Sequence, residues 1–264
     1  QAKTRFAPDY SYIFDVNKEN TYDLFSVQFA SGNQGLGSSL AGYVTEGSGG
    51  VMIPEWFYSG YHLQGQDIRV DTLLVNDMKK LGDKRLETSV TEGYWDTTEH
   101  GFTPEDSAKH YKERCMMIKY LVKDNTNKTI KAWNDYPLNF PILRPADAYL
   151  LYAEALINNN KASQAKEWID AIRQRADLSP LDHVPTMDDV MDERRYEFIG
   201  EGKRYFDLVR MGKDTFVSTL KNFSDHYEHV TKMGANNPSE KDLLLPIPLT
   251  VMNIQASWTN NPGY

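Results

Sequence analysis

Hydrophobic positions recur at helical spacing between Leu143 and Gly212, the most strongly patterned part of the chain. A first apolar stripe, at i, i+3, i+4, i+7 and i+8, consists of Ala148, Leu151, Tyr152, Ala155 and Leu156. After a polar break at 158–161, a second stripe consists of Ala165, Trp168, Ile169 and Ile172. Such spacing puts the apolar side chains on one helix face. Because neither helix is long enough to be stable alone, we expect an antiparallel hairpin in which the two stripes pack together.

Two further segments have helical spacing. One follows a loop that contains Pro180 and Pro185, and its apolar positions are Phe198, Tyr205, Phe206 and Val209. The other runs from Arg69 to Leu86, and its apolar positions are Leu73, Leu74, Met78 and Leu81. Gly82 marks its end, because glycine just past the last periodic residue commonly terminates a helix. The chain from Pro141 to about Phe216 is therefore predicted to be a helical scaffold.

Only short stretches predict β-strand. Tyr12–Val16 is a β-like run, and residues 116–122 alternate in a way typical of a strand. A polar turn at 124–127 would connect this strand to a hairpin partner at 130–133. The tail at 243–248 is apolar but contains two prolines, so we expect it to lie extended across the core rather than inside a sheet.

The first part of the chain is rich in loops and holds clusters of aromatic residues. Glycine and serine dominate 31–50, and a loop this long inside a compact domain is usually functional or disordered. Aromatic and imidazole rings are concentrated at 54–62, and a second aromatic pair lies at 94–95. These clusters are candidate binding sites, because aromatic rings stack on ligands. The alternative, that the same rings cap a loop-rich core, stays open.

Composition and charge mainly exclude certain classes of function. The chain has 264 residues, enough for one large domain or two small ones, with a formal net charge of −8 and a pI near 5.3. That balance argues against a nucleic-acid partner, which requires clustered lysine and arginine. The single cysteine, Cys115, reads as a buried strand residue, so packing rather than disulfides must stabilise the fold. No apolar run approaches the length of a transmembrane helix, and the first residues contain no signal-peptide core.

Three patterns suggest chemistry without completing a site. The glycine-rich run at 32–39 lacks the lysine of a phosphate-binding loop. The two histidines within 226–229 are spaced for a metal only if helical, and no third ligand is evident. Glu193, Glu197 and Glu201 share a helix face, yet no nucleophile or activating histidine accompanies them. We expect these carboxylates to pair with nearby arginines, and we predict no catalytic residue, no metal and no cofactor.

An ordered series of motifs carries a family resemblance. The run LRPADAYLLYAEAL at 143–156 resembles the hallmark helix of the SusD/RagB family of Bacteroidetes outer-membrane nutrient-binding lipoproteins. IRQRA at 172–176 resembles the end of that family's next helix, and the segment from Glu193 to Arg210 resembles its ERR...EG.R.FDL.R signature. LPIP at 245–248 and NPGY at 261–264 resemble its closing elements. The ordered series spans about half of the chain, which makes it far more specific than any single motif.

The resemblance extends upstream in weaker form. GDKRL at 82–86 is similar to a shorter family element that usually has proline at its third position, and Tyr12–Phe14 adds to it, so residues 1–264 resemble the C-terminal SusD/RagB region. Within it we expect a loop-rich, ligand-facing part at 1–140 and a helical scaffold with a C-terminal tail at 141–264. No lipobox cysteine lies near the start, and the family's N-terminal helices are missing, so the chain resembles a C-terminal fragment.

The resemblance implies a mainly helical fold with tetratricopeptide-like helix pairs and long irregular loops on the ligand side, beside the small β-hairpin predicted above. It implies a surface lipoprotein of the outer membrane that captures glycans without chemistry and passes them to a SusC-like TonB-dependent transporter. Attachment to the membrane would be only through an N-terminal lipid anchor, which is absent from this chain. The sequence leaves open which glycan or peptide is bound, and whether calcium steadies the loops.

The ligand-binding residues are predicted from composition and loop context, because sugar rings pack their C–H faces on aromatic planes. The predicted stacking platforms are Trp56, Tyr58, Tyr61 and Trp95, with Tyr43 and Tyr94 behind them and Gln64, Asp67 and Asp96 as hydroxyl partners. Two other classes of function stay open. One is a helical scaffold that binds a peptide or protein of the same transport complex, and the other is a hydrolase that uses the face of Glu197 and Glu201.

Overall fold

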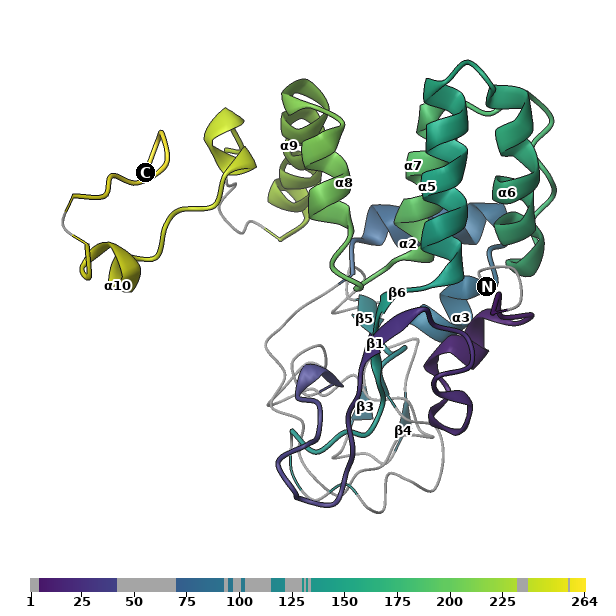
Figure 1. Cartoon of the computed structure of the whole chain (residues 1–264), viewed down its shortest axis with the longest axis horizontal. Helices are drawn as coiled ribbons and strands as arrows, with labels where there is room; N and C mark the ends of the chain where they lie inside the picture. The colour runs from purple at the N-terminus through teal and green to yellow at the C-terminus, as the bar shows by residue number, and fades with distance from the viewer. Residues whose placement is uncertain are drawn as a thin grey trace. The chain divides into compact units, whose positions relative to one another are not determined.

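A computed structural model of the chain describes residues 5–41, 70–92, 95–96, 101–102, 115–121, 130, 132, 134–231, 237–255 and 257–264. By its internal contacts the chain divides into two units, residues 1–202 and residues 203–264. Figure 1 shows the described helices and strands with the labels used below.

The predicted helical hairpin is present in the first unit as α5, Pro145–Asn158, and α6, Ala162–Arg175. The predicted face of α6 is confirmed, because Ala165, Ile169 and Ile172 are fully buried while Trp168 is partly buried. A third helix, α7, Met187–Glu197, contacts both members of the hairpin, and the three helices lie side by side (Figure 1).

The predicted buried face of α5 is wrong. The helix buries Ala146, Tyr149, Leu150, Ala153 and Leu156. By contrast, Leu151 and Tyr152 of the predicted stripe are 45% and 49% exposed. The helix carries apolar residues on two adjacent faces, and both have the same helical spacing. The buried face is the one that joins α6 and α7 in a single hydrophobic cluster.

The third predicted helix is divided into two. α7 ends at Glu197, and α8, Arg204–Arg210, begins after a turn in which Gly200 and Gly202 have φ angles of 70° and 72°. Glycine adopts this left-handed backbone without the steric cost that other residues incur. Phe198 consequently packs with α5 and α6, whereas Phe206 is 68% exposed.

The helix predicted upstream is confirmed as α2, Thr72–Leu81. Asp71 caps its start by accepting a hydrogen bond from the Leu73 N–H at 2.9 Å, and Gly82 ends it in the left-handed conformation. A short helix, α3, Arg85–Ser89, follows directly. These two helices lead the chain from the predicted loop region into a strand.

The β-like run at Tyr12–Val16 is wrong, because the segment forms two 3-10 helices, η1, Tyr10–Phe14, and η2, Val16–Lys18. Asp9 and Asp15 precede the two helices, and each carboxylate accepts a hydrogen bond from the backbone N–H two residues later. Capping of this kind favours a turn over an extended strand. Both ends of η1 are thereby buried in the core of the first unit.

The described strands form three antiparallel pairs. These are β1, Phe25–Val27, with β6, Phe140–Leu143; β2, Val90–Glu92, with β5, Cys115–Met117; and β3, Trp95–Asp96, with β4, Gly101–Phe102. The strand predicted at 116–122 is therefore real but shorter, and it pairs with β2. Of its predicted partner at 130–133 the structure describes only residues 130 and 132, and neither is in a strand. A turn follows β5, closed by a hydrogen bond from the Leu121 N–H to the Ile118 carbonyl at 2.9 Å. The predicted turn at 124–127 lies outside the described residues.

One hydrophobic cluster holds the strand pair β2–β5 against α2 and η1. Its members include Tyr10, Phe14, Ala41, Val70, Met78, Val90, Cys115, Leu121 and Ile130. Cys115 is only 1% exposed, which confirms its predicted burial in a strand. This cluster and the α5–α6–α7 cluster are the two cores of the first unit.

The second unit contains α8, α9, Lys213–Thr231, the 3-10 helix η4, Glu240–Leu243, and α10, Leu249–Met252. The proline-interrupted tail has no regular structure at 245–248, as predicted, and its position across a core stays a prediction. Leu244 and Leu245 are 54% and 68% exposed. Among the helices that the structure describes, none combines the length and the apolar character needed to span a bilayer.

Candidate functional site

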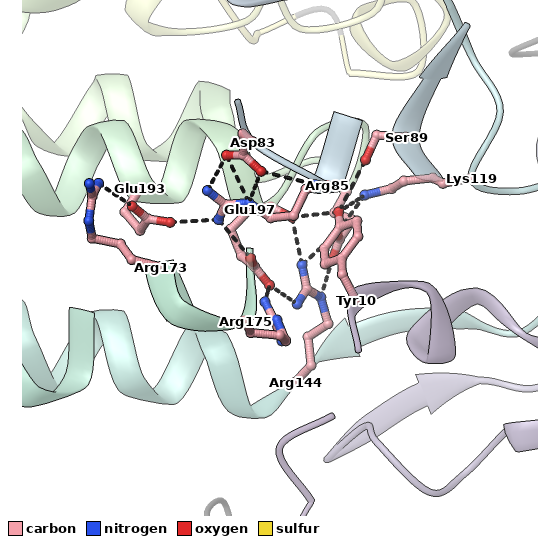
Figure 2. Close-up of polar contacts among 11 residues, drawn as sticks. Tyr10, Asp83, Arg85, Ser89, Lys119, Arg144, Arg173, Arg175, Glu193 and Glu197 are labelled. Carbon is pink, nitrogen blue, oxygen red and sulfur yellow. Dashed lines mark hydrogen bonds and ion pairs between the residues drawn. The ribbon is translucent and has the colours of Figure 1, made fainter. Parts of the chain in front are cut away.

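Glu197, the last residue of α7, lies at the centre of a buried ion-pair network (Figure 2). Its Oε1 accepts hydrogen bonds from Arg144 Nη1 at 2.5 Å and from Arg175 Nη2. Its Oε2 accepts a hydrogen bond from Arg85 Nη1 at 3.0 Å. Arg144 precedes α5, Arg175 ends α6 and Arg85 begins α3. One carboxylate therefore joins three separate elements to α7.

Glu201 extends the network toward the strands. Arg144 donates to both of its oxygens, from Nε at 2.7 Å and from Nη2 at 2.8 Å. Lys119, which follows β5, donates to the same carboxylate at 2.7 Å and to the Tyr10 hydroxyl at 3.3 Å. Tyr10 in turn donates to the backbone carbonyl of Glu197 at 2.9 Å. The network thus fixes η1 and the end of β5 against the turn after α7.

Asp83 and Glu193 complete the network around Arg85. Asp83 accepts from Arg85 Nε and Nη2 at 2.9 and 2.5 Å, and Glu193 lies 2.6 Å from Arg85 Nη1. Four buried carboxylates, Asp83, Glu193, Glu197 and Glu201, pair with four buried cations, Arg85, Lys119, Arg144 and Arg175. A fifth cation, the less buried Arg173, lies 3.5 Å from Glu193. Proteins tolerate buried charges in this balanced, hydrogen-bonded form.

The pKa values of Glu197 and Glu193 are shifted in opposite directions. Burial alone would raise the pKa of Glu197, but the surrounding guanidinium groups, that of Arg175 first, lower it far below its ordinary value. For Glu193 burial is decisive and raises the pKa above its ordinary value, although Arg85 opposes the change. Glu197 is therefore a permanent anion at neutral pH.

This arrangement is a structural clamp and not an acid–base site. A carboxyl group that acts as a general acid or base must reach the proton it transfers. Glu197 and Glu201 are 0% and 4% exposed, and arginine or lysine groups occupy their oxygens. The prediction that the carboxylates pair with arginines is confirmed, and the hydrolase alternative loses the accessible carboxylate pair that it requires.

The partners of these carboxylates were not predictable from their neighbours. Arg194, adjacent in the helix, instead pairs with Asp147 of α5 at 2.7 Å. Arg85 and Arg144 come from positions 112 and 53 residues before Glu197. The sequence signal is that both arginines lie in family-like motifs, GDKRL and LRPAD.

The stretches that contain the aromatic candidates begin and end at the same core cluster. Ala41 precedes the stretch 42–69 and Val70 follows it, while Glu92 and Cys115 flank the stretch 93–114. The Val70 N–H donates to the Cys115 carbonyl at 2.8 Å, and Glu92 pairs with Cys115 in the β2–β5 register. The end of the stretch 42–69 and both ends of the stretch 93–114 therefore lie at neighbouring positions in the first unit.

Trp95 and Asp96 are the two predicted ligand-binding residues whose backbone the structure describes. Trp95 lies in β3, opposite Phe102 of β4, and the next residue, Asp96, pairs with Gly101. The remaining candidates lie outside the described residues; they are Tyr43, Trp56, Tyr58, Tyr61 and Tyr94, together with Gln64 and Asp67. Their assignment stays a prediction.

We predict that the stability of the first unit decreases as pH rises through the titration of His183. This imidazole lies 2.9 Å from Asp182 and 3.1 Å from Asp189, and these hydrogen bonds raise its pKa above the ordinary 6.5. A raised pKa means that the stabilisation is complete below about pH 6.5 and is lost as pH rises through the folded-state value. Asp189 also forms the capping box of α7 with Thr186. Melting temperatures between pH 6 and 8 should therefore decrease, and His183→Gln should flatten that decrease; an unchanged slope in the variant would contradict the assignment.

Comparisons of the sequence with known proteins identify one family. The sequence model of the SusD family matches residues 12–264. A SusD-like protein from Bacteroides ovatus is 37% identical over 112 residues, which cover 40% of this chain and 20% of that protein. The starch-binding protein SusD from Bacteroides thetaiotaomicron is 32% identical over 162 residues, which cover 60% of this chain and 28% of that protein. The match therefore spans less than a third of either curated relative.

Solved structures are similar over nearly the whole chain. Surface glycan-binding protein A from Bacteroides thetaiotaomicron has a TM-score of 0.72 at 22% identity, covering 97% of this chain and 55% of that chain. The same protein in complex with laminarihexaose has a TM-score of 0.70, again at 22% identity with 97% and 55% coverage. At this identity the likeness establishes the fold, and it confirms the predicted mainly helical class.

Proposed function

The chain belongs to the SusD family, and from that premise we propose that it captures oligo- or polysaccharides without chemical conversion and delivers them to a SusC-like TonB-dependent transporter. The names of its relatives support the first step, since one is a starch-binding protein and another a surface glycan-binding protein. The work would take place at the outer-membrane surface, in a lipoprotein.

The observation that carries the proposal is the convergence of the two aromatic stretches on one core cluster. The stretch 42–69 starts at Ala41 of this cluster and finishes at Val70 beside β5, and the stretch 93–114 starts and finishes at the β2–β5 pair. Segments tethered at neighbouring points can present their side chains to one ligand, and binding residues are commonly carried on loops held by a rigid scaffold. The buried network around Glu197 supplies that rigidity, because it fixes α3 before β2 and Lys119 after β5.

The chemistry of the stretches fits a sugar ligand. Indole and phenol rings offer flat apolar faces to sugar C–H groups, and amide or carboxylate groups bind the hydroxyls. We propose Trp56, Tyr58, Tyr61 and Trp95 as the stacking platforms, with Tyr43 and Tyr94 behind them and 1–140 as the ligand-facing part. The acidic charge of the chain, −8, disfavours strongly anionic polymers.

One observation favours the alternative of a peptide- or protein-binding scaffold. Leu151 and Tyr152 on the outer face of α5 are 45% and 49% exposed, and neighbouring exposed apolar residues on a helix are a common protein-contact surface. This face and the aromatic stretches are separate parts of the sequence. Substitutions in one therefore test its role without altering the other.

The test is retention in affinity gels containing laminarin, starch, xylan or mucin. The Trp56→Ala/Trp95→Ala variant should bind the retained polysaccharide at least about 10-fold more weakly, because large aromatic anchors dominate binding energy. Trp258→Ala is the matched control, since Trp258 is 51% exposed in the second unit. Retention equal to that of the control would overturn the assignment. Loss in Leu151→Ala/Tyr152→Ala instead would favour the scaffold.

A further inference from the structure

We propose that a pocket beside the η1–η2 turn holds a single neutral sugar residue, as a subsite separate from the aromatic stretches. The pocket has a volume of about 280 Å³ and lies between that turn, α3 and the turn after β5. Its rim carries the polar side chains of Ser11, Asp15, Asn17 and Thr88, and its floor includes Phe14 and Ile118. The inference rests on the proposed glycan-binding function, which it deepens by adding a second contact.

The floor of the pocket is fixed by the core. The Phe14 ring packs edge-on against Tyr120, with ring centroids 5.9 Å apart. The Ile118 N–H donates to the Ser89 carbonyl at 2.9 Å, and both floor residues are buried. A floor that does not rearrange lowers the entropic cost of binding a small ligand. Its apolar surface suits the C–H face of a sugar ring.

The rim is ordered in the same way and keeps hydrogen-bonding capacity. Asp15 Oδ1 accepts from the Asn17 N–H at 2.9 Å and from Asn17 Nδ2 at 3.2 Å, while Oδ2 accepts from Lys18 Nζ at 2.6 Å. A carboxylate offers about four lone-pair positions, so these three contacts leave room for a ligand hydroxyl. The Ser11 hydroxyl donates to Asp9 at 2.7 Å, which leaves its oxygen as an acceptor. Each rim group is half-buried or exposed and can be reached from solvent.

Charge and size limit the class of ligand. Burial would raise the pKa of Asp15, but hydrogen bonds from Lys18 and Asn17 lower it overall, so at neutral pH this carboxylate is ionised and paired with the Lys18 ammonium group. The ammonium group of Lys119 is already paired with Glu201 at 2.7 Å, so an anionic ligand would meet no available cation there. The volume is just below the range of about 300–1,000 Å³ typical of pockets for drug-sized molecules. A single uncharged ring with several hydroxyls fits these limits.

A second subsite would matter most for polymers. When two weak sites engage one chain, the second contact becomes intramolecular and overall avidity rises without any stronger individual site. The pocket would receive a chain end or a side branch, because it has room for one ring. The aromatic stretches would hold other residues of the same glycan.

The experiment is a titration of the ¹⁵N-labelled chain with methyl glycosides of glucose, galactose, mannose and xylose, and with laminarihexaose. Binding in the pocket should shift the amide signals of Asn17, Thr88 and Leu121, and these shifts should persist in the Trp56→Ala/Trp95→Ala variant. Thr88→Val keeps the side-chain shape and removes one hydroxyl, so it should weaken this binding about 2- to 10-fold. Thr21→Val, outside the pocket, is the control and should bind like the original chain.

The outcomes separate this inference from the proposed function. Suppose that polysaccharide retention depends on Trp56 and Trp95, that no pocket signal shifts, and that Thr88→Val binds like Thr21→Val. This result overturns the proposed pocket but supports the proposed glycan-binding function. Pocket shifts that need higher sugar concentrations in Thr88→Val than in Thr21→Val support the inference even where the tryptophan variant retains polysaccharide normally. If no glycan changes any signal and no gel retains the chain, both fail. Because the shifts are measured on the original chain, a variant that folds poorly does not obscure the result.

Discussion

Replacing Glu197 with glutamine should lower the free energy of unfolding of the first unit by about 3–5 kcal/mol. The substitution keeps the side-chain shape but removes the negative charge that three guanidinium groups share. Arg85 would keep Asp83 and Glu193, and Arg144 would keep Glu201, but the buried Arg175 would lose the carboxylate with which it pairs. A buried charge that loses its partner is strongly destabilising. Urea denaturation followed by tryptophan fluorescence measures the change.

The matched control is Asp177→Asn. Asp177 pairs with Lys84 at 2.8 Å, but both side chains are mostly exposed, at 66% and 62%. Solvent screening limits such a pair to roughly 0–1 kcal/mol. Equal losses in the two variants would contradict the view that the Glu197 network clamps the fold.

Acid titration offers a second measure of the same clamp. The pKa of Glu197 is lowered on folding, so its stabilisation is complete above its ordinary pKa of 4.5 and is lost as pH falls toward the depressed value. Glu193 acts in the opposite sense, because its raised pKa makes the folded chain bind a proton more readily. Glu197→Gln should remove the loss of stability at acid pH that comes from Glu197 and keep the opposite contribution of Glu193. If the free energy of unfolding changes with the same slope between pH 5 and 3 in the original chain and in Glu197→Gln, these opposite roles of Glu197 and Glu193 are contradicted.

The sequence predicted elements and family more reliably than faces and partners. Helical spacing located α2, α5 and α6, because an amphipathic pattern depends on a few local residues. It misplaced the buried face of α5, where both the Leu151–Tyr152 and the Tyr149–Leu150 pairs are apolar. Only the position of α6 and α7 decides between two such faces. That information lies in tertiary contacts that no local window contains.

The same limit applies to the candidate site. The pairing of Glu197 with Arg85 depends on a contact across 112 residues of chain, so the sequence could indicate an ion pair but not its partner. β2 was missed because three residues are too few to show alternation. The aromatic stretches were recognised by composition alone, and the observation that the structure adds is the neighbouring position of their ends at Val70, Glu92 and Cys115.

Gly200→Ala should destabilise the first unit by about 2–5 kcal/mol, from two separable causes. Gly200 has a φ of 70°, and an alanine in this left-handed conformation costs roughly 1–2 kcal/mol. The added Cβ would also overlap the side chain of Met117 in β5, lying 2.6 Å from its Cε. Met117 is buried at 5% exposure, so its displacement disturbs a packed core and costs about 1–3 kcal/mol more.

Gly202→Ala carries the first cause alone. Gly202 has nearly the same φ, 72°, and a Cβ there meets no described atom within 4 Å, so only the conformational cost should appear. The difference between the two variants in urea denaturation then measures the contact with Met117. In a Met117→Ala background the two glycine substitutions should cost the same, because the obstructing side chain is gone. A persistent difference in that background would mean that the turn after α7 is constrained by something other than β5.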